Sequence, residues 1–157
     1  MEADDTNDLG SLPAMVEAIE KGNDIVIASR FVRGGRLVGF PLWRSVPCVA
    51  VNWLLQLVFA VEKVTDYTIF FRGYSVRLLQ KALDGYGQSL VESTGFVANA
   101  EILLKMSRFR PKIHEVPLVY QYDRKESRSK LKIFFTIRQY LRLVALHLSR
   151  RKMIPGP

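Results

Sequence analysis

The short run Asp24-Ile-Val-Ile-Ala28 constrains the fold more than any other stretch of the chain. Consecutive β-branched residues without polar alternation are typical of a strand that is buried on both faces. The preceding segment predicts a helix, with Ser11 as its N-cap, Pro13 in its first turn and an end near Lys21. A helix followed by a buried strand indicates an α/β fold. Such a sheet needs more strands, which we expect upstream of Met1.

Composition limits the class of protein and the kinds of site. The chain has 157 residues, enough for one domain, and its 48% hydrophobic content excludes a disordered tail. A formal net charge of +8 points to a polyanion, a phosphorylated ligand or an anionic membrane surface. The single cysteine, Cys48, excludes an internal disulfide and a zinc site with several cysteines.

The longest apolar stretch, Val46–Val61, is too short to span a membrane. It has sixteen residues, interrupted by Asn52 and Gln56, whereas a span needs about 20 apolar residues. It predicts a buried or membrane-surface helix over roughly 49–61, after a glycine-rich basic loop. The remaining predictions are a strand at 65–72, helices at 75–83 and 96–109, a strand at 112–122 with Pro117 at an edge or bulge, and a final helix at about 131–151.

Two acidic residues near the start of the chain, Glu2 and Asp4, are candidate metal ligands. On an extended backbone residues i and i+2 face the same way, so both carboxylates can bind one Mg²⁺ or Mn²⁺ together with substrate phosphates. The alternative is an ordinary solvated acidic terminus.

The glycine-rich segment holds candidate phosphate ligands. Arg30 precedes the glycines and Arg44 follows them. An arginine donates two parallel hydrogen bonds to phosphate, and glycines let a backbone approach a ligand closely. A surface loop with solvated arginines is the alternative. Further along, Asp66 and Arg72 flank an apolar segment, either as a structural ion pair or with Asp66 facing a site as a base or supporting carboxylate.

The end of the chain is strongly basic. Between Arg124 and Lys152 there are ten Lys or Arg residues and one acid. Apolar residues at helical spacing predict a basic amphipathic helix over 132–152. Such a helix can pack on its own domain, lie in a membrane interface or cover nucleic acid. The basic residues gather beside apolar stripes, and no zinc ligands or RNA-binding aromatic motif appear, so we expect no nucleic acid partner.

Taken together, these motifs have a specific order: a carboxylate pair, a helix and buried strand, SRFVRGG, PLWR, DYTIFFR, EVP, and a basic SKL before a helix. From Glu2 to about Leu143 the chain resembles the carboxy-terminal half of family 2 glycosyltransferases of the polyprenyl-phosphate type, such as the dolichyl-phosphate mannosyltransferases. The resemblance implies a single partial domain, the acceptor-side half of a GT-A fold, which ends in amphipathic membrane-surface helices. The nucleotide-binding half is expected upstream.

The resemblance also implies an activity: metal-dependent, inverting transfer of a hexose, mannose or glucose, from a nucleotide sugar to a polyprenyl phosphate. The donor is GDP-mannose or UDP-glucose, and the acceptor is dolichyl or undecaprenyl phosphate. The enzyme is peripheral on the cytoplasmic face of a membrane, or membrane-anchored if a longer chain carries transmembrane helices. The residues that the resemblance assigns are Glu2 and Asp4 for Mg²⁺ or Mn²⁺, Asp66 and Arg30 for catalysis, and Arg30, Arg44, Arg128, Ser129 and Lys130 for the acceptor phosphate.

Four departures from the family pattern put donor and acceptor identity in question. Glu2 replaces an aspartate, Thr6 a glutamine, Ile69-Phe70 a Ser-Gly pair, and Cys48 a small hydroxyl residue. Without a nucleotide-binding half, we expect the chain alone to bind sugar nucleotides poorly. Thermal stabilisation by GDP or UDP with Mn²⁺ would contradict this. The alternative function is a non-catalytic fragment that binds a membrane surface or a lipid phosphate.

Overall fold

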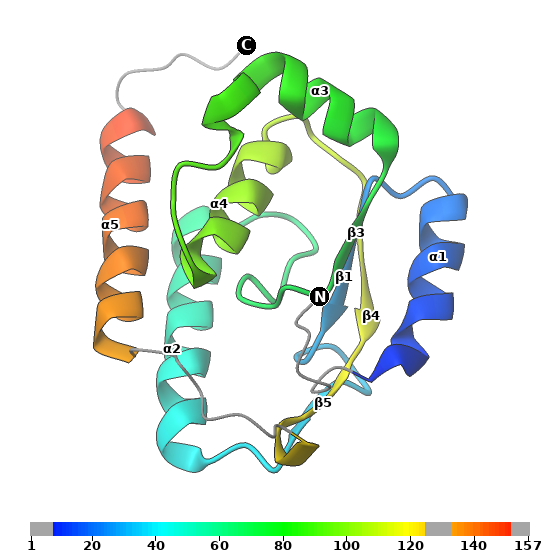
Figure 1. Ribbon diagram of the computed structural model, residues 1–157, viewed down its shortest axis with the longest axis vertical. Coiled ribbons are helices and arrows are strands. Elements are labelled where there is room, and N and C mark those ends of the chain that lie inside the picture. Colours follow the sequence, from blue (N-terminus) through cyan, green and yellow to red (C-terminus); the bar gives the residue numbers. More distant parts are fainter. Residues whose placement is uncertain (1–7, 125–132, 152–157) are drawn as a thin grey trace.

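The computed structural model of the chain describes residues 8–124 and 133–151 and has a mixed α/β architecture (Figure 1). Its helices are α1 (Leu12–Glu20), α2 (Leu42–Phe59), α3 (Val76–Tyr86), α4 (Phe96–Ser107) and α5 (Ile133–Arg151). Its strands are β1 (Ile25–Ser29), β2 (Arg36–Val38), β3 (Arg72–Tyr74), β4 (Ile113–Pro117) and β5 (Val119–Gln121). Short 3-10 helices lie at Leu9–Ser11, Gly87–Leu90 and Tyr122–Arg124.

The main sheet has the order β3-β1-β4, with β1 in the centre. β1 pairs parallel with β4 and antiparallel with β3, and the parallel register places Ser29 opposite Pro117. All five residues of β1 are buried, as the apolar run predicts. In Figure 1, α1 lies on one side of this sheet and α2, α4 and α5 on the other. This layering confirms the α/β fold and explains why no face of β1 is polar.

The first helix starts near the predicted position but is fixed differently. Ser11 occupies the N-cap of α1, with proline in the first turn, yet its side chain does not cap the helix. The Ser11 hydroxyl instead donates to the carbonyl of Pro117, at 2.8 Å. The start of α1 is therefore bonded to the carboxyl end of β4.

Helix α2 begins at Leu42, seven residues before the position that the sequence predicts, and includes Pro47. The prediction was wrong because proline lacks an N–H and usually marks a helix boundary. Here Pro47 lies near the amino end of the helix, where its ring removes one hydrogen bond from the second turn. The helix ends at Ala60, which adopts the left-handed conformation at φ 45°.

The predicted strand over 65–72 is also wrong, except for its last residue, because only Arg72 enters β3. Tyr67, Ile69 and Phe71 are buried and alternate as in a strand. Their alternation comes from packing into the core, and side chains from other elements bind many of the backbone groups of this segment. Conversely, β2 lies inside the predicted glycine-rich loop and pairs parallel with β5.

The predicted final helix is confirmed over the described residues, where α5 runs from Ile133 to Arg151. One face of α5 packs on the core through Tyr140 and Val144, whereas Phe134 is 90% exposed. Within residues 8–124 and 133–151, no helix combines the length and the apolar character that a membrane crossing requires.

Candidate functional site

A buried ion pair lies where β1 ends. Arg30 directly follows β1, and its Nε and Nη2 atoms donate to the two carboxylate oxygens of Asp66, both at 2.8 Å. The side chains are 6% and 0% exposed. Such a bidentate pair fixes the plane of the guanidinium. The carboxyl ends of parallel strands are the usual place for ligand sites in α/β sheets, so this pair is the centre of the candidate site.

The Asp66 carboxylate also orders the backbone around it. It accepts hydrogen bonds from the backbone N–H groups of Thr68, Ile69 and Arg30, at 3.2, 3.1 and 3.3 Å. Burial alone would raise the pKa of Asp66, but the charge and hydrogen bonds of Arg30 outweigh burial and lower it. Asp66 is therefore held as a carboxylate, and its chemistry is that of a fixed negative charge.

The Arg30 guanidinium is enclosed by side chains, and one of its nitrogens, Nη1, does not bond the Asp66 carboxylate. Nη2 also donates to the Thr68 hydroxyl at 2.6 Å, and Nη1 lies 3.8 Å from the sulfur of Cys48 on α2. The rings of Phe31 and Tyr120 lie 5.3 and 5.9 Å from its central carbon. Burial would lower the pKa of Arg30, but the charge of Asp66 raises it. Arg30 therefore stays a cation in a largely apolar setting.

A second group of polar side chains holds the segment that carries Asp66. Glu115 of β4 accepts hydrogen bonds from the N–H groups of Thr65 and Asp66, at 2.9 and 3.1 Å. From α2, Asn52 and Gln56 both donate to the Thr65 carbonyl, at 2.7 and 2.6 Å. Asn52 also accepts from the N–H of Tyr67, at 2.8 Å. The position of Asp66 is thus determined by β4 and α2 together.

Arg72 does not form the side-chain ion pair with Asp66 that was one of two interpretations of the sequence. Its Nη1 donates to the carbonyl of Asn99 at 2.9 Å, and its Nη2 donates to the carbonyl of Asp66 at 3.2 Å. The Asn99 amide in turn donates to the Ile69 carbonyl. Helix α4, which carries Asn99, therefore contributes to the same polar cluster.

Several residues that the sequence assigns to the site lie outside what the structure describes. Glu2, Asp4, Arg128, Ser129 and Lys130 fall in the undescribed ranges 1–7 and 125–132. Arg44 lies in the first turn of α2, but its side chain is not described. Of the assigned residues, the structure therefore brings together Arg30 and Asp66. Across residues 8–124 and 133–151, no group of three or more His, Cys, Asp or Glu side chains is placed to hold a metal ion.

Sequence reasoning missed the residues that support Asp66. Glu115 was visible only as part of the EVP motif, and its partner is distant in sequence. Asn52 and Gln56 did leave a signal, because two polar residues four positions apart in an apolar helix share one face. That face is the one that contacts the Asp66 segment.

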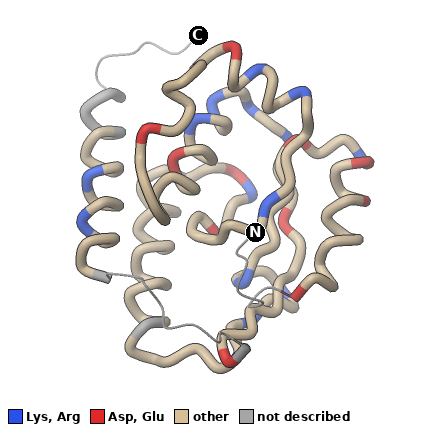
Figure 2. The backbone as a smooth tube through the Cα atoms, viewed as in Figure 1, with Lys and Arg blue, Asp and Glu red and all other residues tan. Residues whose placement is uncertain are grey.

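The adjacent face of α2, about a quarter turn from Asn52 and Gln56, is an exposed apolar stripe. The stripe consists of residues at helical spacing, with exposed fractions between 43% and 80%: Leu42, Val46, Val49, Trp53 and Leu57. No Lys, Arg, Asp or Glu occurs between residues 45 and 61, and the described part of α2 is uniformly tan in Figure 2. A contiguous apolar patch of this kind marks an interaction surface.

Comparison with known proteins identifies relatives of the chain. No protein-family model matches it. The dolichol-phosphate mannosyltransferase of Pyrococcus furiosus is 31% identical over 142 residues, which are 90% of this chain and 38% of that protein. The undecaprenyl-phosphate mannosyltransferase of Micrococcus luteus is 29% identical over 131 residues, 83% of this chain and 51% of that protein.

A third relative has the same kind of name. The polyprenol monophosphomannose synthase of Mycolicibacterium smegmatis is 26% identical over 120 residues, 76% of this chain and 43% of that protein. The chain thus spans about half or less of the length of these curated relatives. The matches confirm the resemblance drawn from the motifs: the chain is a relative of the polyprenyl-phosphate mannosyltransferases, which are glycosyltransferases.

Proposed function

We propose that the chain forms the acceptor-side part of a glycosyltransferase that moves a hexose from a nucleotide sugar to a polyprenyl phosphate. The observation that carries the proposal is the buried Arg30–Asp66 pair at the carboxyl end of β1. The names of the relatives support mannose as the sugar and a polyprenyl phosphate as the acceptor. The GT-A fold, the inverting outcome and the alternative of glucose rest on the family resemblance.

Arg30 would bind the acceptor phosphate, and Asp66 would position Arg30. A lipid phosphate is already an anionic nucleophile, so the site needs fixed positive charge more than a strong base. Nη1 is the guanidinium nitrogen without a carboxylate or hydroxyl partner, and we assign it to the phosphate. Asp66 would prevent rotation of the guanidinium. Arg30 would then be a preorganised donor, which needs no rearrangement during the reaction.

Mg²⁺ or Mn²⁺ would be bound by Glu2 and Asp4 with the phosphates of the donor, GDP-mannose or UDP-glucose. Carboxylate oxygens are the ligands that these ions prefer. When bound, the ion would neutralise the charge of the leaving nucleoside diphosphate. Arg44, Arg128, Ser129 and Lys130 would complete the acceptor-side phosphate site, as the family resemblance implies.

The apolar stripe of α2 would dock the protein on the cytoplasmic face of a membrane, where the acceptor is embedded. A helix with one apolar exposed face lies in the plane of a membrane interface. The net charge of +8 would add attraction to anionic lipids. Because Asn52 and Gln56, which hold the Asp66 segment, lie on the adjacent face of α2, docking would place the site beside the lipid surface.

The test uses the 157-residue chain with Mn²⁺ and a short polyprenyl phosphate in liposomes. GDP-mannose or UDP-glucose is supplied at high concentration, because the chain alone is expected to bind sugar nucleotides poorly. We expect glycosylated lipid by mass spectrometry and a loss of about 100-fold or more in Arg30→Gln, comparable to the loss of one catalytic hydrogen-bond donor. Arg77→Gln is the matched control, because Arg77 forms an ion pair with Asp24 at the other end of the sheet. Equal rates in Arg30→Gln and Arg77→Gln would contradict the assignment of Arg30.

The second candidate is a non-catalytic fragment that binds a lipid phosphate at the membrane surface, and the exposed stripe of α2 favours it. The same samples distinguish the two. Arg30-dependent binding of polyprenyl phosphate without product, unchanged in Glu2→Gln and Asp4→Asn, supports the second candidate. Product formation that these two substitutions abolish supports the first.

A further inference from the structure

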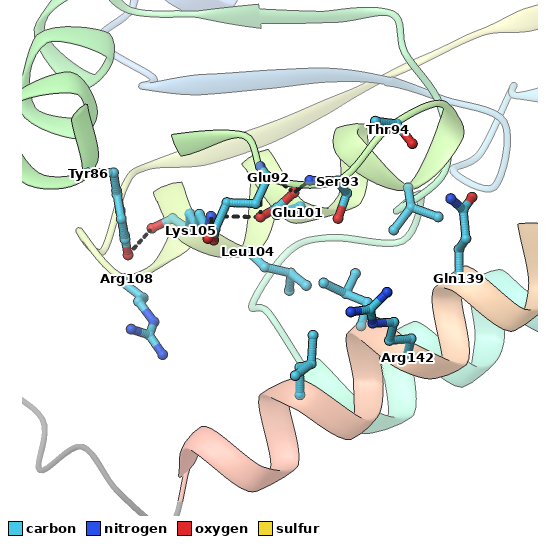
Figure 3. A pocket seen from close by; sticks show the side chains of 13 residues that line it. Tyr86, Glu92, Ser93, Thr94, Glu101, Leu104, Lys105, Arg108, Gln139 and Arg142 are labelled. Atoms are coloured by element: carbon cyan, nitrogen blue, oxygen red, sulfur yellow. Dashed lines mark hydrogen bonds and ion pairs between the residues drawn. The ribbon is translucent and has the colours of Figure 1, made fainter. Parts of the chain in front are cut away.

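A cavity of about 480 Å³ lies between α4, α5 and the segment that joins α3 to α4 (Figure 3). Its volume is within the range of small-molecule sites, about 300–1,000 Å³. None of its lining residues belongs to the Arg30–Asp66 cluster or to the residues that hold it. The cavity is therefore separate from the proposed acceptor site.

One wall of the cavity is apolar. Val97 and Leu104 come from α4, and Leu143 and Leu146 come from α5. Leu146 is 46% exposed, although it faces a hollow between two packed helices. An apolar chain placed against this wall would remove these side chains from water, at about 25 cal/mol for each Å² buried.

The charged side chains of Glu92, Glu101 and Lys105, which also line the cavity, neutralise one another. Lys105 forms ion pairs with Glu101 at 2.6 Å and with Glu92 at 2.8 Å, and lies 5.7 Å from the ring centre of Tyr86. Glu101 also accepts a hydrogen bond from the N–H of Ser93 at 2.7 Å. Burial would raise the pKa of Glu101, but its bonds with Lys105 and Ser93 lower it. These groups fix the segment before α4 and are already paired.

Two cations that line the cavity remain unpaired. Arg108 follows the last residue of α4, and Arg142 extends from α5 beside Gln139 (Figure 3). Within the part of the chain that the structure describes, neither guanidinium has an ion-pair or hydrogen-bond partner. A ligand that complements this cavity therefore needs an apolar body and an anionic end.

We propose that the cavity binds an anionic amphiphile, a single apolar chain that ends in a phosphate. The chain lies along Leu104, Leu143 and Leu146, and Arg142 binds the phosphate. Arginine suits this role because its planar fork binds phosphate oxygens in pairs. The site is independent of the proposed transfer reaction, so binding here is expected whether or not the chain is catalytic.

Octyl phosphate is the probe, added below its micelle concentration and measured by calorimetry with the purified 157-residue chain. We expect octyl phosphate to bind, and inorganic phosphate and octanol to bind much more weakly. Inorganic phosphate lacks the apolar chain, and octanol lacks the phosphate. Arg142→Gln should weaken binding about tenfold or more, since a charge-assisted hydrogen bond contributes roughly 1.5–3 kcal/mol. Leu146→Trp should block the apolar wall and weaken binding to a similar extent.

Two matched controls lie on the same helix. Arg138 is exposed on α5 one turn before Arg142, and Leu141 is 51% exposed; neither lines the cavity. Arg138→Gln and Leu141→Trp make the same chemical changes and should leave the affinity unchanged. The two controls also distinguish binding in this cavity from non-specific adsorption of the probe to the apolar stripe of α2.

The proposal is overturned if octyl phosphate does not bind at millimolar concentration. It is also overturned if Arg142→Gln and Arg138→Gln weaken binding equally, or if inorganic phosphate or octanol binds as tightly as the probe. Loss of binding in Arg30→Gln with none in Arg142→Gln would place the amphiphile at the acceptor site instead. Failure here leaves the proposed transfer reaction unaffected, because that reaction is tested through Arg30.

Discussion

At the scale of single residues, Asp66 is the position on which the candidate site depends. Its carboxylate receives the Arg30 guanidinium and three backbone N–H groups. Removing one partner from a buried ion pair leaves the other charge uncompensated, which typically costs about 3–5 kcal/mol. Asp66 therefore both positions Arg30 in the candidate site and stabilises the backbone around it.

We expect Asp66→Asn to lower the free energy of unfolding at pH 7 by about 3–5 kcal/mol, measured by urea denaturation. The folded pKa of Asp66 is lowered, so its stabilisation is present above the unfolded value of about 3.9. It is lost as pH falls through the folded pKa, and the difference between wild type and variant should narrow there. Asp84→Asn, at an exposed position of α3, should show neither effect.

At the scale of elements, α2 joins a binding surface to the site. Its inner face holds the Asp66 segment through Asn52 and Gln56, and its outer face is the apolar stripe. The two faces have opposite chemistry, and substitutions should separate their roles.

On the inner face, Asn52→Leu should destabilise the chain more than Gln56→Leu. Asn52 is 2% exposed and bonds both the Thr65 carbonyl and the N–H of Tyr67. Its loss leaves a buried N–H unpaired, at about 1–3 kcal/mol. After Gln56→Leu, Asn52 still bonds the Thr65 carbonyl, so the loss should be smaller. Denaturant unfolding of both variants measures the difference, and equal losses would contradict this role of Asn52.

On the outer face, Trp53→Lys and Leu57→Lys should reduce binding to liposomes several-fold while changing the unfolding free energy by about 0.5 kcal/mol or less. Both side chains are nearly 70% exposed, at 68% and 69%. Val76→Lys is the control, since Val76 is equally exposed, at 69%, but lies on α3. Liposome co-sedimentation would rule out the α2 stripe if all three variants bound equally.

At the scale of the whole molecule, the net charge of +8 should make membrane binding sensitive to lipid composition and salt. We expect tighter binding to liposomes with anionic lipids than to neutral ones, and a decline of that advantage as salt rises, because the Debye length falls from about 10 Å at 0.1 M to about 3 Å at 1 M. Binding to neutral liposomes should change little with salt. A salt series in co-sedimentation measures both, and salt-independent binding to anionic liposomes would contradict the electrostatic contribution.

The sequence predicts elements whose signal is local. The buried run of β1 and the helix that starts beside Ser75 are examples. Prediction from the sequence fails where an element depends on residues that are distant in the chain. The strand β2 exists because Arg36–Val38 meets β5, and side chains of distant residues, rather than a neighbouring strand, bind the backbone of Thr65 and Tyr67.

The candidate site follows the same division. Arg30 and Asp66 can be named from motifs, but their contact spans 36 positions, and the only ion-pair partner that the sequence suggested for Asp66 was Arg72. Glu115 has no local signal for its role, since its partners are backbone N–H groups about 50 positions earlier. Residue types therefore indicate the chemistry of the site, and the fold decides its pairs.

The contact between Glu115 and the Asp66 segment also sets an order of folding. Asp66 bonds residues 36 positions before it and 49 positions after it. Closing such long loops costs entropy before any bond repays it. On the ribosome, the site cannot be completed until β4 has emerged and paired with β1. A nascent chain that lacks β4 should therefore leave Arg30 and Asp66 in contact with water, and the pair should become buried only after β4 has been made.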